Sequence, residues 1–294
     1  MSPSQATDIS LERRHNMNPM DRKPIPLTED EKKNPISKYY TEQITPPNPE
    51  LMGILLSGPM NPEDSIKPEE ARKLLAPGYM KTETGYCIMD NRCGYLCVNN
   101  RFPGLTLDMI KWWFAWHPLE SLRYKIWNPY CHPYAAIADC DREKIMDMSV
   151  PIEDKIADVV HFVVENIGAG MQDIVIHFEK PECFGFTKEE LKEAHSYAIG
   201  GYGLVENREG EKGKLPVIML HYFREIEGGV ETRTRFWMGY RIVKGHPVCV
   251  LPEGVTVPIE APMGLAMHNV EEFGHLASFL PRIYAEFGEN KPIC

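Results

Sequence analysis

The stretch HNVEEFGHLASFLPRIYAEF, residues 268–287, governs how the rest of the chain is interpreted. Its apolar residues recur every three or four positions, which is the period of an amphipathic α-helix. His268 and Glu272 stand four residues apart and share one face of that helix, with His275 on nearly the same face. An imidazole and a carboxylate at this spacing can bind one divalent metal ion, or they can form a solvated surface pair. Spacing alone leaves both interpretations open.

The composition limits the class of protein. The chain has 294 residues, of which 43% are hydrophobic, so it can build one large domain with a substantial core. Its formal net charge of -10 argues against binding to nucleic acid or to an anionic membrane surface. No apolar run is long enough to cross a bilayer, the N-terminus has no signal-peptide core, and none of the eight cysteines forms a C-x-x-C pair. We therefore expect a cytoplasmic protein.

The beginning of the chain differs in character from the rest. Residues 1–50 are polar and rich in proline, which predicts an extended arm that wraps the domain or a partner subunit. A short helix is predicted from Pro68 to Leu75, because proline begins it and two glutamates follow in its first turn. We divide the chain into an N-terminal arm with short helices, residues 1–84, and a main domain, residues 85–294.

Aromatic residues dominate the start of the main domain. Residues 85–98 carry aromatic and β-branched side chains on either side of Asp90-Asn91, which predicts two short strands joined by a turn. A helix over residues 107–117 follows, with Thr106 as its N-cap. Its large aromatic rings need burial in the core, and they can also form the wall of a site for a flat aromatic ligand, because the two roles are compatible. These rings belong to Trp112, Trp113, Phe114 and Trp116.

Residues 155–167 fit either a helix or a strand. Their β-branched side chains and the glycines that follow favour a strand. In a strand, His161, Val163 and Glu165 share one face. A carboxylate on the apolar face of a strand needs a partner, because a lone buried charge is costly. Either a metal ion or a salt bridge would supply that partner.

Three further strands have clear signals, and Gly228-Gly229 joins the last two of them as a hairpin. A helix is expected from Thr187 to about Tyr197, between the first and the second of these strands. The predicted strands cover residues 173–179, 216–224 and 232–243. Three arginines on them are interpreted as an exposed strand face: Arg224, Arg233 and Arg235.

Antiparallel strands followed by one long helix predict an α+β fold. A curved sheet that grips a helix leaves a cavity between the two. His268 and Glu272 would point into this cavity, opposite Glu165 and His132. His132 lies between proline-containing loop segments, where a histidine is a better metal-ligand candidate than in the middle of a helix.

Four segments together resemble a known family, the zinc-dependent carbon–carbon hydrolases of acylphloroglucinols, which includes 2,4-diacetylphloroglucinol hydrolase and phloretin hydrolase. The resemblance covers residues 85–287, and the C-terminal segment is its longest and most specific part. The segments are WWFAWHPLESLRYKIWNPYCH (112–132), VVENIG (163–168), GGVETRTRFWMGY (228–240) and HNVEEFGHLASFLPRIYAEF (268–287).

The resemblance implies a fold, a metal and a set of ligands. The fold would be a Bet v 1-like helix-grip, with a smaller N-terminal region that contributes to a homodimer. The family binds one Zn²⁺ through two histidines and two glutamates. Carried over by position, these ligands are His132, Glu165, His268 and Glu272, with His161 in reserve for the fourth ligand.

The resemblance also implies roles for other residues. Tyr124 matches the tyrosine of the LRYK motif that holds a phenolic hydroxyl of the substrate. For the implied chemistry, the general acid is either His221 or a zinc-bound water. His221 and Tyr222 are neighbours on a strand, so only one of them can point inward, and we favour His221. Tyr222 and Tyr240 are both candidates for a second substrate tyrosine, and Trp116 for the aromatic wall.

The implied reaction is hydrolysis of the aryl–acyl carbon–carbon bond of an acylated phloroglucinol, which gives a phloroglucinol and a carboxylic acid. The sequence leaves open whether the acyl group is a short acetyl, as in 2,4-diacetylphloroglucinol, or a long dihydrochalcone chain, as in phloretin. The alternative function is a helix-grip protein that binds phenolic or hydrophobic ligands without catalysis.

Overall fold

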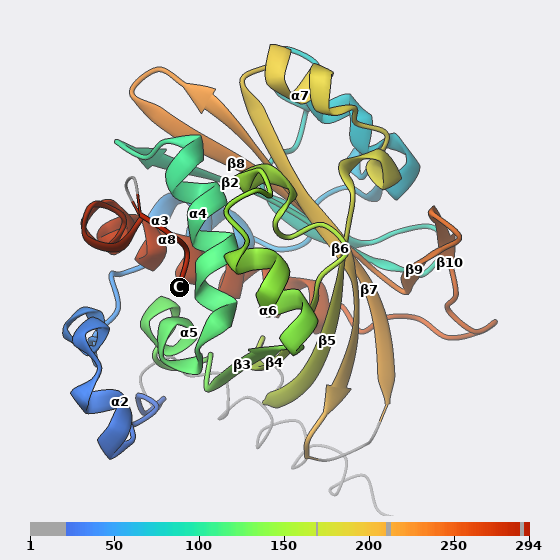
Figure 1. Ribbon diagram of the computed structural model, residues 1–294. Coiled ribbons are helices and arrows are strands. Elements are labelled where there is room, and N and C mark those ends of the chain that lie inside the picture. The colour runs from blue at the N-terminus through green and yellow to red at the C-terminus, as the bar shows by residue number, and fades with distance from the viewer. Residues whose placement is uncertain (1–21, 169, 210–212, 289–290) are drawn as a thin grey trace, which may run out of the picture.

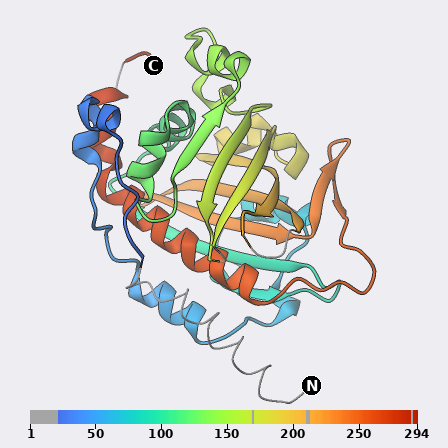
Figure 2. The same cartoon turned by 90° about the horizontal axis from the view of Figure 1, so that it is seen from below.

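The computed structural model describes residues 22–168, 170–209, 213–288 and 291–294. One antiparallel sheet of eight strands, in the order β1-β2-β8-β7-β6-β5-β4-β3, packs against a long C-terminal helix, α8 (Glu260–Phe287) (Figures 1 and 2). This arrangement confirms the predicted α+β class. The strands are β1 (Gly85–Ile88), β2 (Gly94–Pro103), β3 (Tyr134–Ile137), β4 (Val160–Asn166), β5 (Met171–Glu179), β6 (Ser196–Asn207), β7 (Lys214–Ile226) and β8 (Gly229–Met238).

Helices and a small second sheet surround the large sheet. β9 (Tyr240–Val243) and β10 (His246–Cys249) form a separate hairpin. Among the helices that the structure describes, none has both the length and the apolar character of a membrane span. The α-helices are α2 (Glu29–Lys33), α3 (Pro49–Leu56), α4 (Leu107–Trp116), α5 (Ser121–Trp127), α6 (Asp139–Met146) and α7 (Lys188–Glu193). The 3₁₀ helices are η2 (Pro35–Tyr39), η3 (Pro62–Asp64), η4 (Pro68–Leu75), η5 (His117–Leu119), η6 (Ile152–Asp154) and η7 (Pro181–Phe184).

The two faces of the sheet bury different side chains. Along β7, Val217 and Met219 belong to the core cluster beneath α8, α4 and α5, whereas Ile218 and Leu220 belong to a second cluster on the opposite face. Successive side chains of a strand point to opposite faces, so this alternation is what a strand between two buried layers requires. We name the face towards α8 the inner face and the other the outer face.

The predicted elements agree with the structure over most of the main domain. The segment that fitted either a helix or a strand forms β4, and Thr106 caps α4 as expected, accepting a hydrogen bond from the Met109 amide at 3.3 Å. Gly229 pairs with Ile226 in the predicted hairpin. The predicted strand over residues 232–243 is divided into β8 and β9 at Gly239, whose φ of 96° is unfavourable for other residues.

The prediction for residues 187–197 was wrong in part, because α7 ends at Glu193 and β6 begins at Ser196. β6 had no counterpart among the predicted strands, since its glycines resemble a loop. These glycines let neighbouring atoms come close to the β6 backbone. A Cβ on Gly201 would lie 2.2 Å from the His177 carbonyl oxygen, and one on Gly200 would lie 2.7 Å from the Phe184 ring. The glycines therefore allow tight packing within the sheet.

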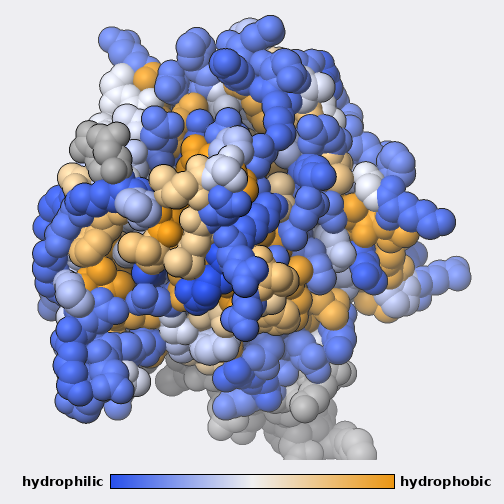
Figure 3. All heavy atoms as spheres, viewed as in Figure 1, coloured by the Kyte–Doolittle hydropathy of each residue, from blue (hydrophilic) through white to orange (hydrophobic). Residues whose placement is uncertain are grey.

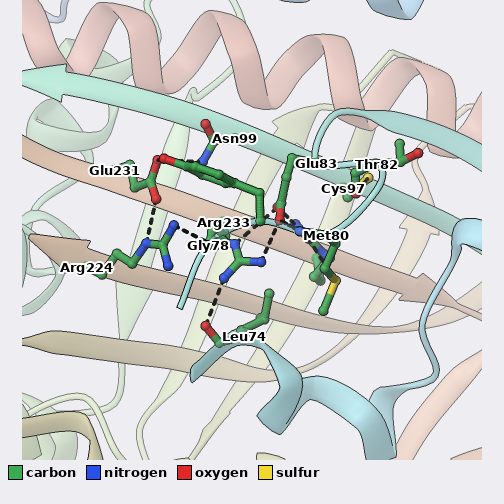
Figure 4. A network of polar contacts seen from close by, with 12 residues as sticks. Leu74, Gly78, Met80, Thr82, Glu83, Cys97, Asn99, Arg224, Glu231 and Arg233 are labelled. Carbon is green, nitrogen blue, oxygen red and sulfur yellow. Dashed lines mark hydrogen bonds and ion pairs between the residues drawn. The ribbon is translucent and has the colours of Figure 1, made fainter. Parts of the chain in front are cut away.

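The interpretation of Arg233 and Arg235 as exposed was also wrong, because they are only 1% and 0% exposed. The chain after η4 crosses the outer face of the sheet and covers them. Glu83 on this segment accepts a hydrogen bond from Arg233 at 2.5 Å (Figure 4). It accepts another from Arg235 at 2.6 Å. The sequence pattern of β8 does not indicate that this face is covered, because the covering residues lie about 150 positions earlier in the chain.

The N-terminal arm lies against the main domain, and residues 1–21 of the predicted arm lie outside the described residues. The remainder contains short helices, so it is less extended than predicted. The Ile25 amide donates to the Pro129 carbonyl at 2.7 Å, and the Tyr39 hydroxyl donates to Glu286 of α8 at 2.7 Å. Figure 2 shows this blue segment beside α8. The helix predicted from Pro68 to Leu75 is present as η4.

Candidate metal centre and cavity

A cavity lies between the inner face of the sheet and helices α8, α4 and α5. Its empty space is about 800 Å³, its opening to solvent included. Most of the lining is apolar, and hydrophilic residues dominate the outer surface in the view of Figure 3. A mostly apolar cavity with a few polar groups is the usual form of a small-molecule site. The polar lining residues are His117, Tyr124, His161, Glu165, His221, His268 and Glu272.

Three buried side chains converge at one wall of this cavity. The Nε2 atoms of His132 and His268 are 3.2 Å apart, and Glu272 Oε2 lies 3.6 Å from each of them. α8 supplies His268 and Glu272 from successive turns, as the spacing of four residues predicted. His132 comes from the loop after α5, where its amide donates to the Asn128 carbonyl at 3.0 Å. The chain therefore brings together residues that are more than 130 positions apart.

The spacing of these atoms fits one metal ion. Zinc–nitrogen bonds of about 2.0–2.1 Å in tetrahedral geometry place two ligand atoms roughly 3.3 Å apart. All three ligand atoms lie within 4.8 Å of one another. Asn269 donates to Glu272 Oε1 at 3.2 Å, which orients the carboxylate. The His132 ring is held by stacking on Tyr124, with ring centroids 4.1 Å apart and planes 12° from parallel.

Glu165 lies beside this group and contacts one of its members. Its Oε2 is 4.0 Å from His268 Nε2, while its Oε1 accepts a short hydrogen bond from the Tyr124 hydroxyl. β4 presents Glu165, Val163 and His161 to the cavity, as the strand interpretation predicted. Glu165 is therefore placed at the edge of the candidate metal centre, next to a phenol that can bind a ligand.

Burial shifts the pKa values of these groups towards their neutral forms. Burial raises the pKa of the Glu165 carboxyl to about 8, and it raises the pKa of Glu272 well above its usual value, with further help from the charge of Glu165. Burial also lowers the pKa of His268 to about 4. Two carboxyls without a cation beside them are costly to ionise, and a divalent metal ion would supply that cation.

His221 lies elsewhere on the cavity wall, on β7. Its Nδ1 is 2.9 Å from the Thr234 hydroxyl, and its ring centroid is 5.2 Å from that of Phe273. Burial lowers the pKa of its imidazole to about 3, so the ring is neutral near pH 7. The structure thus places His221 on the inner face, which agrees with the preference for His221 over Tyr222.

Three residues expected to contact a substrate do not line the cavity. Tyr222 follows His221 on β7 and therefore faces outward, where it stacks on Phe186. The Tyr240 hydroxyl accepts a hydrogen bond from Asn91 at 2.7 Å within the outer core cluster.

The third of these residues, Trp116, packs on the Arg123 guanidinium, which lies 3.9 Å from its ring centroid. Phe114 of the same helix lines the cavity instead. Side chains two positions apart on an α-helix point in nearly opposite directions, so Phe114 and Trp116 cannot both face the cavity.

His117 is a polar cavity residue that the sequence did not single out. Its Nδ1 is 2.9 Å from the Trp113 carbonyl oxygen, which only accepts, so Nδ1 carries the hydrogen. Its ring stacks on Tyr124, with centroids 5.7 Å apart, and lies 5.8 Å from the ring of His161. His161 contacts His117 rather than the three converging side chains. The only local signal for His117 was its position directly after the aromatic helix.

Comparisons with known proteins agree on one family. The family model described as "DAPG hydrolase PhiG domain" matches residues 66–285. The chain is 34% identical over 269 residues to a phloretin hydrolase of Eubacterium ramulus, covering 89% of this chain and 93% of that protein. It is 30% identical over 305 residues to a 2,4-diacetylphloroglucinol hydrolase of Pseudomonas protegens, covering 96% of this chain and 95% of that protein.

Proposed function

Because this chain belongs to the 2,4-diacetylphloroglucinol hydrolase family, we propose that it hydrolyses the carbon–carbon bond between the ring and the acyl group of an acylphloroglucinol. One water is consumed: its hydroxyl joins the acyl carbon to form a carboxylic acid, and a proton replaces the acyl group on the ring. The observation that carries the proposal is the buried group of His132, His268 and Glu272 at the wall of a mostly apolar cavity.

The proposal includes a zinc ion held by His132, His268 and Glu272, with Glu165 as the fourth ligand. Two imidazoles and two carboxylates suit Zn²⁺, although the same set also accepts Mn²⁺, Fe²⁺ or Co²⁺. When bound, the ion would polarise an acyl carbonyl and lower the pKa of water. The raised pKa values of Glu165 and Glu272 support a cation at this position, because their ionised forms otherwise have no compensating charge.

In this proposal Tyr124 orients the ring that leaves. Its hydroxyl donates to Glu165 and is therefore fixed beside the candidate metal centre, where it can accept a hydrogen bond from a ring hydroxyl. Ring hydroxyls ortho and para to the acyl group stabilise the protonated ring carbon, which turns a poor leaving group into a better one. A carboxylate oxygen of Glu165 or Glu272 would take the proton of the attacking water.

His221 is the proposed proton donor to the ring carbon. As a neutral imidazole it carries one hydrogen, and Thr234 can donate to Nδ1 so that this hydrogen sits on Nε2. The Thr232 hydroxyl lies 3.4 Å from the Thr234 hydroxyl on the same strand and helps to fix its position. The proton lost from Nε2 would be restored by a solvent water after the products leave the cavity.

A carrier without catalysis is less well supported. A binding protein gains nothing from ionisable side chains buried in its cavity, because burying them without partners destabilises the fold. An apolar or neutral polar lining would hold a phenol as well. The cavity instead contains four histidines, two glutamates and a tyrosine among its polar residues.

The proposal extends to the whole molecule. We assign the fold to the Bet v 1-like helix-grip class, and we propose a division into residues 1–84 and a catalytic domain over residues 85–294. We further propose a homodimer, to which the N-terminal region contributes. Sedimentation of the purified protein over a range of concentrations would test the homodimer.

Metal content and turnover test the proposed function together. Elemental mass spectrometry of the untagged protein should give close to one zinc per chain. Hydrolysis of phloretin or 2,4-diacetylphloroglucinol should stop after chelation and resume with added zinc. Chromatography should detect a phloroglucinol and the matching acid. A protein without metal, and without turnover after zinc addition, would contradict the proposal and favour the carrier.

A further inference from the structure

Glu271 is a buried carboxylate on α8 that stands next to the candidate ligand Glu272 but does not line the cavity. Its two oxygens accept hydrogen bonds from the Arg22 guanidinium, at 3.0 Å to Oε1 and at 2.5 Å to Oε2. Oε1 also accepts from the Asn128 side-chain amide at 3.1 Å. Paired hydrogen bonds between an arginine and a carboxylate fix the orientation of both groups. Glu271 therefore joins the N-terminal arm, α8 and the segment after α5.

Asn128 is the residue on which the loop that carries His132 is built. Its carbonyl oxygen accepts hydrogen bonds from the amide of Cys131 at 3.2 Å and from that of His132 at 3.0 Å. Its side-chain oxygen accepts from the Tyr130 amide at 3.1 Å. A displaced Asn128 would therefore carry the His132 ring with it. The contact between Asn128 and Glu271 thus sets where His132 lies relative to α8.

The N-terminal arm also contacts this loop directly. Arg22 donates to Cys131 Sγ at 3.1 Å, and the Tyr130 hydroxyl donates to the Glu42 carbonyl oxygen at 2.5 Å. The Arg22 guanidinium lies 5.4 Å from the centroid of the Tyr130 ring. Arg22 therefore contacts both α8 and the loop after α5, the two elements whose side chains converge at the candidate metal centre. An ion pair that served only to attach the arm to α8 would not need the contacts with the loop.

We infer that Arg22 is a positioning residue for the candidate metal centre, because it holds the loop of His132 against α8 through Glu271. This inference rests on the proposed function, which treats His132, His268 and Glu272 as metal ligands. Groups that hold metal ligands in place typically contribute about 10–100-fold to metal affinity. The N-terminal arm therefore belongs to the active centre, although none of its described residues lines the cavity.

Zinc affinity tests this inference independently of turnover. We would measure the dissociation constant of zinc for the full chain and for Arg22→Met by competition with a chromogenic chelator. Arg22→Met keeps most of the side-chain length but removes the donors, so zinc should bind roughly tenfold more weakly. Arg22→Lys should recover only part of this loss, because an ammonium cannot form the paired hydrogen bonds. Glu271→Gln should also weaken binding, and adding Arg22→Met to it should cause little further loss, since both act through one contact.

The matched control is Lys38→Met, which removes another cation that links the arm to α8. Lys38 Nζ lies 2.6 Å from Glu286 Oε1. Glu286 stands near the end of α8, about five helical turns from His268. Lys38→Met should therefore keep the wild-type zinc affinity. An equal loss of affinity in Lys38→Met and Arg22→Met would mean that the arm acts only through overall stability. That result, or an unchanged affinity in Arg22→Met, would overturn the inference.

Hydrogen exchange of the metal-free proteins separates this inference from the proposed function. In Arg22→Met the amides of Cys131 and His132 should exchange roughly tenfold faster than in the wild type, because their acceptor Asn128 is held less firmly. Lys38→Met should leave these rates unchanged. If the wild type binds no zinc, the metal centre of the proposed function fails, and faster exchange in Arg22→Met alone would still support the positioning role. Equal exchange in the wild type and Arg22→Met would overturn it.

Discussion

Two groups of buried ionisable side chains lie on opposite faces of the same sheet, and they differ in how well their charges are matched. On the outer face, Glu83 accepts from two arginines, and Glu231 accepts from Arg224 at 2.6 Å and from Asn99 at 3.1 Å (Figure 4). On the inner face, His132, His268, Glu165 and Glu272 have no lysine or arginine among the residues that line the cavity. We name these the outer cluster and the cavity cluster.

The pKa shifts of the two clusters run in opposite directions. Burial alone would raise the pKa of Glu83, but the hydrogen bond from Arg233 and the charge of Arg235 hold it below its usual value. For Glu165 burial has no such opposition, and its pKa rises to about 8. Both carboxyls are buried, but Glu83 stays ionised beside its arginines, whereas Glu165 lacks a cation that would stabilise its ionised form.

The largest expected effect is the loss of activity in His268→Ala. Removing one of three converging ligand atoms should abolish stoichiometric metal binding and lower kcat/KM by roughly a thousandfold or more. Metal analysis and steady-state kinetics measure both quantities.

The melting temperature of metal-free His268→Ala should stay close to that of the metal-free wild type, because His268 is one of the unmatched groups of the cavity cluster. Turnover at the wild-type rate in this variant would contradict the assignment of the cavity cluster as the active site. A large loss of stability instead would mean that the cavity cluster is structural like the outer one.

The converse change in the outer cluster should affect stability rather than chemistry. Glu83→Gln leaves Arg233 and Arg235 buried without their carboxylate, and breaking such a buried pair typically destabilises a protein by about 3 kcal/mol or more. Urea unfolding at pH 7 measures this loss. The folded fraction should keep the wild-type kcat/KM, because the outer cluster faces away from the cavity. A variant as stable as the wild type would show that the arginines find other partners.

A smaller effect should appear when the pH is lowered. The pKa of Glu83 is lower in the folded protein than in the unfolded chain, so its contribution to stability is complete above the unfolded pKa. That contribution is lost as the pH falls through the folded pKa. The unfolding free energies of the wild type and Glu83→Gln should therefore converge as the pH falls below the usual glutamate pKa of about 4.3, whereas buried histidines affect both proteins equally. Parallel pH profiles would contradict this assignment of Glu83.

Local patterns were enough to predict much of the cavity cluster. The spacing of four residues put His268 and Glu272 on one face of α8, and the alternation of β4 put Glu165 and His161 on one wall. Both inferences depend only on the geometry of a single element. His132 was different, because a loop residue has no period: its position between proline-containing segments made it a candidate, and the resemblance to a family assigned it as a ligand.

The outer cluster was missed for a related reason. Whether Arg233 is exposed depends on what covers β8, and the cover comes from η4 and the segment after it. Nothing in the alternation of β8 distinguishes a strand face open to water from one covered by a distant segment. β6 was missed because its glycines serve contacts with His177 and Phe184, which are decided by neighbouring elements rather than by the strand itself.

The smallest expected effect tests whether a side chain on the outer face of the sheet contributes to activity. Tyr222→Phe removes a hydroxyl from a side chain that stacks on Phe186 outside the cavity, so kcat/KM should stay within about twofold of the wild-type value. His221→Phe, one position earlier on the same strand, should lose most of its activity with little change in stability. Steady-state kinetics and melting temperatures of the two variants test this contrast. Tyr222 and His221 are neighbours on one strand, but only His221 lines the cavity. A more than tenfold loss of kcat/KM in Tyr222→Phe at unchanged stability would therefore mean that the outer face contributes to catalysis.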